Sequence, residues 1–142
     1  MLPRVLRPRC ASLVLVAWLL LPACAAVAAG DMTEDQSAQF LAALQDAVRS
    51  GQPKAVAALV IFPLRVYHGR QATRIKDAPS FVKAYAHIFT PGVTKAVLAQ
   101  KPGDLFHNWQ GSMIGNGQVW FAGVCSDAAC KQQRIGVTAV NN

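Results

Sequence analysis

Histidine is the side chain best suited to acid or base chemistry near neutral pH, and this chain has three. His107 shares strand parity with Trp109, so we expect it to point toward the apolar, concave face of a sheet, where it could act as a general base or acid. His68 lies beside a glycine at a predicted hairpin tip, and His87 lies at the margin of a predicted helix's apolar stripe. Both positions favour surface residues without a catalytic role. For His107, too, a structural role is the commoner interpretation, with the ring at the edge of the core and only part of its hydrogen-bonding capacity used.

Few carboxylates are free for chemistry, because four of the seven acidic residues fall between Asp31 and Asp46. Asp77 is the one most easily imagined in catalysis, yet its position two residues before a proline is explained by a helix cap. The sequence has no paired-carboxylate, Ser-His-Asp or metal-ligand spacing. The glycines of WQGSMIGNGQVWF are flanked by strands, whereas a phosphate cradle needs a helix N-terminus. We therefore expect no cofactor and no metal.

The N-terminus has the three-part pattern of a signal peptide. Three arginines precede an uncharged apolar run from Leu13 to Leu21, which is far shorter than the roughly 20 residues of a membrane span. Small residues follow, and cleavage after Ala28 fits best, with a cut after Ala25 as the alternative. LPAC resembles a lipobox that would lipidate Cys24, but its proline departs from the usual pattern. We predict a signal peptide over 1–28 and a periplasmic or secreted protein.

The mature chain, residues 29–142, is long enough for one domain with a real core. Three of the 14 basic residues lie in the signal peptide, so 11 remain against 7 acidic residues and the net charge falls from +7 to +4. The remaining basic residues are scattered singly without interleaved aromatic residues, which argues against a nucleic-acid partner. After cleavage, Cys125 and Cys130 are the remaining cysteines, and in an exported protein they are expected to form a disulfide.

Periodicity and caps predict the elements. A capping box at Thr33 starts a helix that reaches Val48, a second short helix follows Pro53, and LRVYHGRQATRI forms a hairpin. Asp77 caps a third helix that runs to Phe89. The pattern of residues 93–100 fits either a helical turn or an edge strand, and strands follow it to the C-terminus.

The segment WQGSMIGNGQVWF predicts a hairpin, because Asn116-Gly117 is the strongest short signal for a type I′ turn. This register places Met113 opposite Trp120 and separates two faces. The inward, cavity-lining set is expected to be Trp109, Met113 and Trp120, and the outward set is Ile114, Val119 and Phe121, with Arg134 beside it. A disulfide between directly opposed cysteines would place Ile135 opposite Trp120 in the next strand pair.

The element order, and segments such as FPLRVYHGR, FVKAYAHIFTPGV and LFHNWQGSMIGNGQVWF, resemble those of small exported bacterial proteins of the NTF2-like superfamily. The resemblance implies an α+β cone, in the order α-α-β-β-α-β-β-β, with helices in the concave face of a curved antiparallel sheet. Its cavity is an active site in some members, such as ketosteroid isomerase and scytalone dehydratase, and is filled in others. An enzyme of this kind would use His107 with Asp77 or Tyr85. Members of the superfamily frequently dimerise through the outer sheet face, so a homodimer through the outward set and Arg134 is the first expectation and a heterologous partner the second.

Two classes of function follow from these features. The first is a non-catalytic exported binding module that sequesters a small apolar ligand or docks on an envelope protein, and it is favoured because the assigned inward positions are apolar. The second is a small-molecule enzyme of the isomerase, dehydratase or hydrolase type. An inhibitor or immunity protein against a cell-wall enzyme fits the compartment but rests on no motif.

Overall fold

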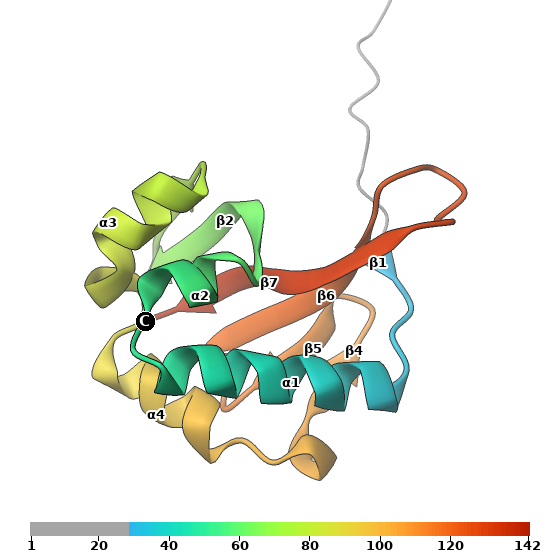
Figure 1. The fold of residues 1–142 in the computed structure, drawn as a ribbon, viewed down its shortest axis with the longest axis horizontal. Coiled ribbons are helices and arrows are strands. Elements are labelled where there is room, and N and C mark those ends of the chain that lie inside the picture. Colours follow the sequence, from blue (N-terminus) through green and yellow to red (C-terminus); the bar gives the residue numbers. More distant parts are fainter. Residues whose placement is uncertain (1–28) are drawn as a thin grey trace, which may run out of the picture.

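Four helices cover one face of a curved mixed sheet in residues 29–142, the residues that the computed structural model describes (Figure 1). The helices are α1 (Glu34–Arg49), α2 (Pro53–Ala57), α3 (Ala78–Ile88) and α4 (Pro91–Ala99), and a 3-10 turn spans Pro102–Asp104. The strands are β1 (Ala29–Gly30), β2 (Val60–His68), β3 (Gln71–Ile75), β4 (Phe106–Asn108), β5 (Gly111–Ile114), β6 (Val119–Cys125) and β7 (Gln133–Asn141). The α+β class is confirmed, while the predicted signal peptide lies outside the described residues.

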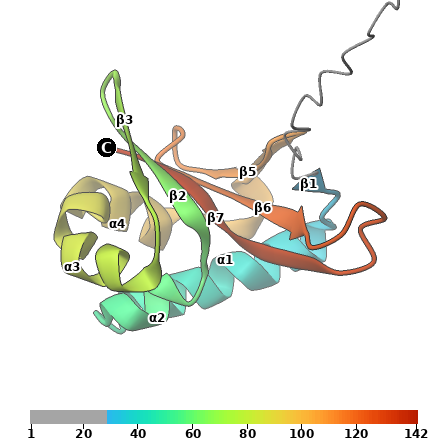
Figure 2. The ribbon, with the colours of Figure 1, turned by 90° about the horizontal axis from the view of Figure 1, so that it is seen from above.

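The sheet runs in the order β3-β2-β7-β6-β5-β4, and β1 adds to β6. Every pairing is antiparallel except β2 with β7, which is parallel, so the prediction of a purely antiparallel sheet was wrong. Parallel neighbours need a long crossover, and here the chain between them includes α3, α4 and the strands β3 to β6. As a result β3 and β4 form opposite edges of the sheet, and the helices gather on one side of it (Figure 2).

The predicted starts of α1 and α3 are confirmed by their caps, and α2 begins at Pro53 as predicted, without a side-chain cap. Thr33 and Gln36 exchange the two hydrogen bonds of a capping box, at 2.9 and 3.1 Å, and Asp77 accepts a 2.9 Å hydrogen bond from the Ser80 amide. The undecided segment is helix α4, which begins after Thr90 with its side chain as the N-cap. Within the described residues, no helix is both long and apolar enough to cross a bilayer.

The core lies between α1 and the sheet, and its closest aromatic pair shows how the two layers meet. Phe40 of α1 packs on Phe121 of β6 with ring centroids 4.7 Å apart. Ile114, Val119 and Phe121 are each 0% exposed, so these side chains point toward the helices. The space that a cone would enclose is therefore filled by apolar side chains at this part of the sheet.

The register of the β5–β6 hairpin is as predicted, but its turn and its faces are not. Met113 pairs with Trp120, whereas the positive φ angles fall at Gly115 and Gly117 and not at Asn116, so the turn is not type I′. Ile114, the first of the predicted outward set, is buried, while Trp109 is 84% exposed. Both faces are apolar, and tryptophan is rarely buried completely whereas isoleucine, valine and phenylalanine often are. Polar residues such as Ser112 favoured the other face as the outward one, but Ser112 is itself buried.

The β6–β7 register also differs from the prediction. Cys125 and Cys130 form the expected disulfide, but Cys125 pairs with Gln133 in the ladder and Cys130 lies in the connecting loop. This pairing shifts the register by three residues and the bulge after Trp120 by one more, so Ala139, and not Ile135, lies opposite that tryptophan. A bridge inside a loop does not fix strand register, because its two residues need not oppose each other.

Candidate functional site

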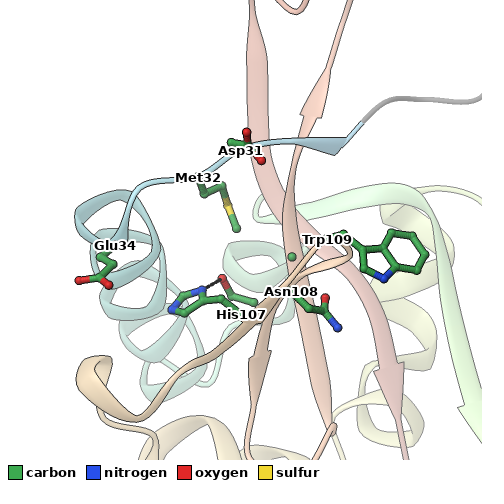
Figure 3. Close-up of a pocket in the computed structure, with 8 residues that line it drawn as sticks. Asp31, Met32, Glu34, His107, Asn108 and Trp109 are labelled. Atoms are coloured by element: carbon green, nitrogen blue, oxygen red, sulfur yellow. Dashed lines mark hydrogen bonds between the residues drawn. The ribbon is translucent and has the colours of Figure 1, made fainter.

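Two surfaces hold the side chains that could carry function, and they lie on opposite sides of the same strands. One is a hollow at the start of α1 that contains His107, and the other is the side of the sheet that faces away from the helices. Figure 3 shows His107 and Trp109 projecting to opposite sides of the chain that carries them. Their shared strand parity was therefore a wrong guide, because Trp109 lies in the turn after β4 and not in the strand.

His107 is held by a chain of hydrogen bonds that ends in the core. Its Nδ1 atom lies 2.8 Å from Ser112 Oγ (Figure 3). Ser112 Oγ lies 3.3 Å from Ser37 Oγ on α1. Both serines are buried, with exposed fractions of 1% or less, while the histidine is exposed. The serines therefore fix the ring without being reachable themselves, so Ser112 is not placed to act as a nucleophile.

The hollow around this histidine has a volume of about 330 Å³. It is lined by Asp31, Met32, Glu34, His107, Asn108, Trp109, Gly111 and Ser112. Carboxylates and an oriented imidazole can transfer protons, which is the chemistry this hollow could support. In the described residues no group of three or more potential ligands is arranged to hold a metal ion.

The predicted acid/base set is not brought together by the fold. His107 lies on β4 at one edge of the sheet, and Asp77 follows β3 at the other edge. Asp77 caps α3, and hydrogen bonds from the Ser80 side chain and amide lower its pKa. Tyr85 stacks on Phe89 with ring centroids 5.4 Å apart, and burial raises its pKa. Both residues have structural partners, so neither can join His107 in one site.

The side of the sheet away from the helices carries a continuous row of paired side chains. Phe106 pairs with Met113, Met113 with Trp120, Trp120 with Ala139 and Ala139 with Arg65. Paired residues project from the same face of a sheet. We call this surface, with Tyr67 and with Trp109 of the turn after β4, the open face; Trp109 also lines the hollow of His107. Phe106 is 52% exposed and Trp109 84%, and Met113, Trp120 and Tyr67 are half-buried.

The open face thus contains the three residues that were predicted to line an internal cavity. Its hollow, of about 180 Å³, is lined by Arg65, Tyr67, Gln110, Trp120, Thr138, Ala139 and Asn141. Sequence reasoning missed Arg65 and Tyr67. Their alternation with Leu64 and Val66, which are buried, was the signal that could have placed them outside.

The residues predicted for an interface have other roles. Ile114, Val119 and Phe121 belong to the core, so they cannot contact another molecule. The Arg134 guanidinium donates hydrogen bonds to the carbonyl oxygens of Ala58, at 2.9 Å, and Val60, at 3.3 Å. Arg134 therefore links β7 by hydrogen bonds to the segment between α2 and the start of β2.

An apolar groove of about 570 Å³ lies between α2 and α3. It is lined by Lys54, Ala57, Ala58, Ala78, Pro79 and Val82. Its walls are almost entirely hydrocarbon, with one lysine among them, so it offers few groups that could orient a ligand.

Comparisons with known proteins add no assignment to these surfaces. No family model matches the chain, and searches of curated proteins and of solved structures found no significant match. The candidate functions therefore rest on the geometry of the described residues.

Proposed function

We propose that this protein is an exported, non-catalytic binding module that docks on another protein of the cell envelope through the open face of its sheet. The single observation that carries the proposal is the exposure of large aromatic side chains there, with Trp109 84% and Phe106 52% exposed. Tryptophan, tyrosine, phenylalanine, methionine and arginine are the residue types enriched in protein interfaces, and the open face contains all five. An aromatic cluster of this kind on a folded surface is typical of a contact site.

The NTF2-like cone is part of the proposal. It is supported by the run α1-α2-β2-β3-α3 followed by strands and by the curved sheet with helices on one side, although the observed order adds β1, α4 and a fourth strand after the helices to the predicted one. In such a cone, the interior would be occupied by side chains such as Phe40, Leu44 and Phe121, each at most 7% exposed. A filled interior favours binding at the surface over binding within a cavity.

In this proposal, a signal peptide over 1–28 exports the protein to the periplasm or the medium. The Cys125–Cys130 disulfide supports it, because disulfides persist in oxidising compartments such as the periplasm. Cleavage after Ala28 would leave the module free, whereas lipidation at Cys24 would tether it. The mass of the processed N-terminal peptide distinguishes these two routes.

The docking proposal is tested by site-specific photocrosslinking in the living cell. A photoreactive residue at position 109 is expected to give a discrete adduct with one envelope protein. The matched control places the same residue at Leu98, which is 38% exposed on α4. Equal adducts from both positions, or none from position 109, would refute docking through the open face.

A small-molecule enzyme remains the second candidate, and one observation favours it. His107 is oriented from beneath by Ser112, so its second ring nitrogen is available in a hollow that also contains Asp31 and Glu34. His107 would then act as the general base or acid. If His107→Ala abolished a turnover found in a substrate screen, the enzyme would replace the binding module.

Two further forms of the binding proposal make different use of the molecule. A small apolar ligand would occupy the groove between α2 and α3. An inhibitor or immunity protein would be one case of docking, with a cell-wall enzyme as the partner. Identification of the crosslinked protein separates that case from the others.

A further inference from the structure

We infer that the partner of the open face is an acidic protein, and that Arg65 binds one of its carboxylate side chains in the hollow beside Trp120. This inference rests on the proposed docking function and names the chemistry of the partner. It is carried by the hollow and by the distribution of charge over the sheet.

The hollow combines donors of hydrogen bonds with flat aromatic walls. Arg65, Gln110 and Asn141 supply guanidinium and amide N–H groups, and Tyr67 and Trp120 supply ring surfaces. Its volume of about 180 Å³ suits a single side chain better than a whole small molecule, since ligand pockets are typically about 300–1,000 Å³. A guanidinium fork matches a carboxylate in geometry and binds it through two parallel hydrogen bonds.

The charge of the open face is positive and is not balanced within the sheet. The seven strands contain no Asp or Glu, whereas Arg65 lies directly opposite Arg74 on β3. In residues 29–142 the one ion pair within 4.0 Å joins Arg49 to Asp46 on α1, so Arg65 has no carboxylate partner there. An exposed arginine beside aromatic rings, without an acid of its own, is available to pair with an acid on another molecule.

The same charges disfavour a second copy of this chain as the occupant. A two-fold dimer brings the same patch of both subunits together. Arg65 and Arg74 of both copies would then share one interface whose strands hold no carboxylate. Like charges placed together in an interface cost several kcal/mol, so complementarity requires an acidic and different protein.

The inference is tested by nuclear magnetic resonance titration of the mature chain with two matched peptides. The probes are acetyl-Ala-Leu-Glu-Leu-Ala-amide and the same peptide with glutamine in place of glutamate. The glutamate peptide is expected to shift the Trp120 indole and Arg65 side-chain N–H signals and to bind at least about tenfold more tightly. No saturable shift up to about 10 mM, or equal binding of the two peptides, would overturn the inference.

Two variants show which arginine is responsible for the preference for the glutamate peptide over the glutamine peptide. Arg65→Gln is expected to reduce the preference for glutamate to about twofold or less, because the fork is lost. Arg74→Gln removes the same charge from the neighbouring position and is expected to keep most of the preference. Both side chains are exposed, so both variants should fold, which their spectra report directly. An equal loss in the two variants would mean general attraction and would overturn the Arg65 pocket.

A single-stranded oligonucleotide serves as the competing polyanion. If an octathymidylate shifted the same signals and bound more tightly than the glutamate peptide, the surface would recognise phosphates and the inference would fall. The crosslink from position 109 remains an independent measure of docking. An adduct without glutamate preference removes this inference alone, whereas the absence of an adduct removes the proposed function as well.

Discussion

Trp109 and Phe121 show how little the size of a side chain says about its role in this protein. Trp109 is 84% exposed, while Phe121 is 0% exposed and packs 4.7 Å from Phe40. We expect Phe121→Ala to lower the free energy of unfolding by about 3–5 kcal/mol, because it leaves a cavity between α1 and the sheet. Trp109→Ser is expected to change it by no more than about 0.5 kcal/mol. Urea denaturation of the two variants measures both values.

If Trp109→Ser lowered the free energy of unfolding more than Phe121→Ala, Trp109 would be the buried residue, as the sequence predicted, and the observed faces would be contradicted. The register of this hairpin was predicted correctly from Asn116-Gly117, although the turn itself is formed by positive φ angles at Gly115 and Gly117 and is not type I′. The faces could not be predicted, because both sets of alternating residues contain large apolar side chains. Contact with Phe40, which lies about 80 positions away along the chain, decides which set is buried.

The serine pair beneath His107 gives a second prediction at the scale of residues. Ser112→Ala is expected to cost about 1–3 kcal/mol, because it leaves Ser37 Oγ without its buried partner. Replacing both serines by alanine should cost less than the sum of the single changes, since no buried hydroxyl is then unpaired. A double-mutant cycle by urea denaturation measures this coupling. Additive losses would show that the 3.3 Å contact contributes nothing.

Among the elements, the β5–β6 hairpin depends on a close approach at Gly111. Its φ is +123°, and an added Cβ would lie 2.3 Å from the Phe121 carbonyl oxygen. Gly111→Ala is expected to cost about 2–5 kcal/mol, from backbone strain together with overpacking. Gly103→Ala is the matched control, since its Cβ would meet no atom within 4 Å, and it should change stability by about 1 kcal/mol or less. Thermal unfolding compares the two, and similar melting temperatures would contradict the close approach.

The start of α3 gives a prediction about pH. Hydrogen bonds from Ser80 hold the folded-state pKa of Asp77 below its ordinary value of 3.8. The ionised cap therefore stabilises the fold above pH 3.8, and this contribution is lost as the pH falls through the lower, folded-state pKa. Asp77→Asn keeps a capping side chain that does not titrate, so its stability should fall less steeply below about pH 4. Equal slopes of stability against pH for both proteins would refute the assigned cap.

The elements themselves were largely predictable because their ends are fixed by local chemistry. The caps at Thr33 and Asp77 act on amides within three residues, so the sequence around them contains the whole signal. The parallel pairing of β2 with β7 and the bulge after Trp120 depend on how distant segments meet. The His107–Ser112–Ser37 chain has the same origin, since Ser37 and Ser112 are 75 positions apart. No local pattern announces such a contact.

For the whole molecule, the two sides of the sheet have separate roles. The side that faces the helices is filled by the core and holds the fold together. The open face carries Trp109 and Phe106, which no part of the described chain covers. Because these side chains are exposed, this surface can change with little effect on stability, and binding can be tested apart from folding.

The oligomeric state follows from the charge of that surface, and it is the prediction that concerns the molecule as a whole. The mature chain is expected to sediment with the mass of one chain at both about 10 and about 200 μM, because a two-fold contact would gather Arg65 and Arg74 of both copies in one interface whose strands hold no carboxylate. Trp120→Ser and its control on α4, Leu98→Ser, should both leave this mass unchanged. Substitution of the predicted interface residue Phe121 by glutamate cannot test dimerisation, because Phe121 is buried and a charge there would unfold the protein. A dimer that dissociates in Trp120→Ser but persists in Leu98→Ser would instead establish self-association through the open face. The acidic partner would then have to compete with a second copy of the chain for the same aromatic side chains.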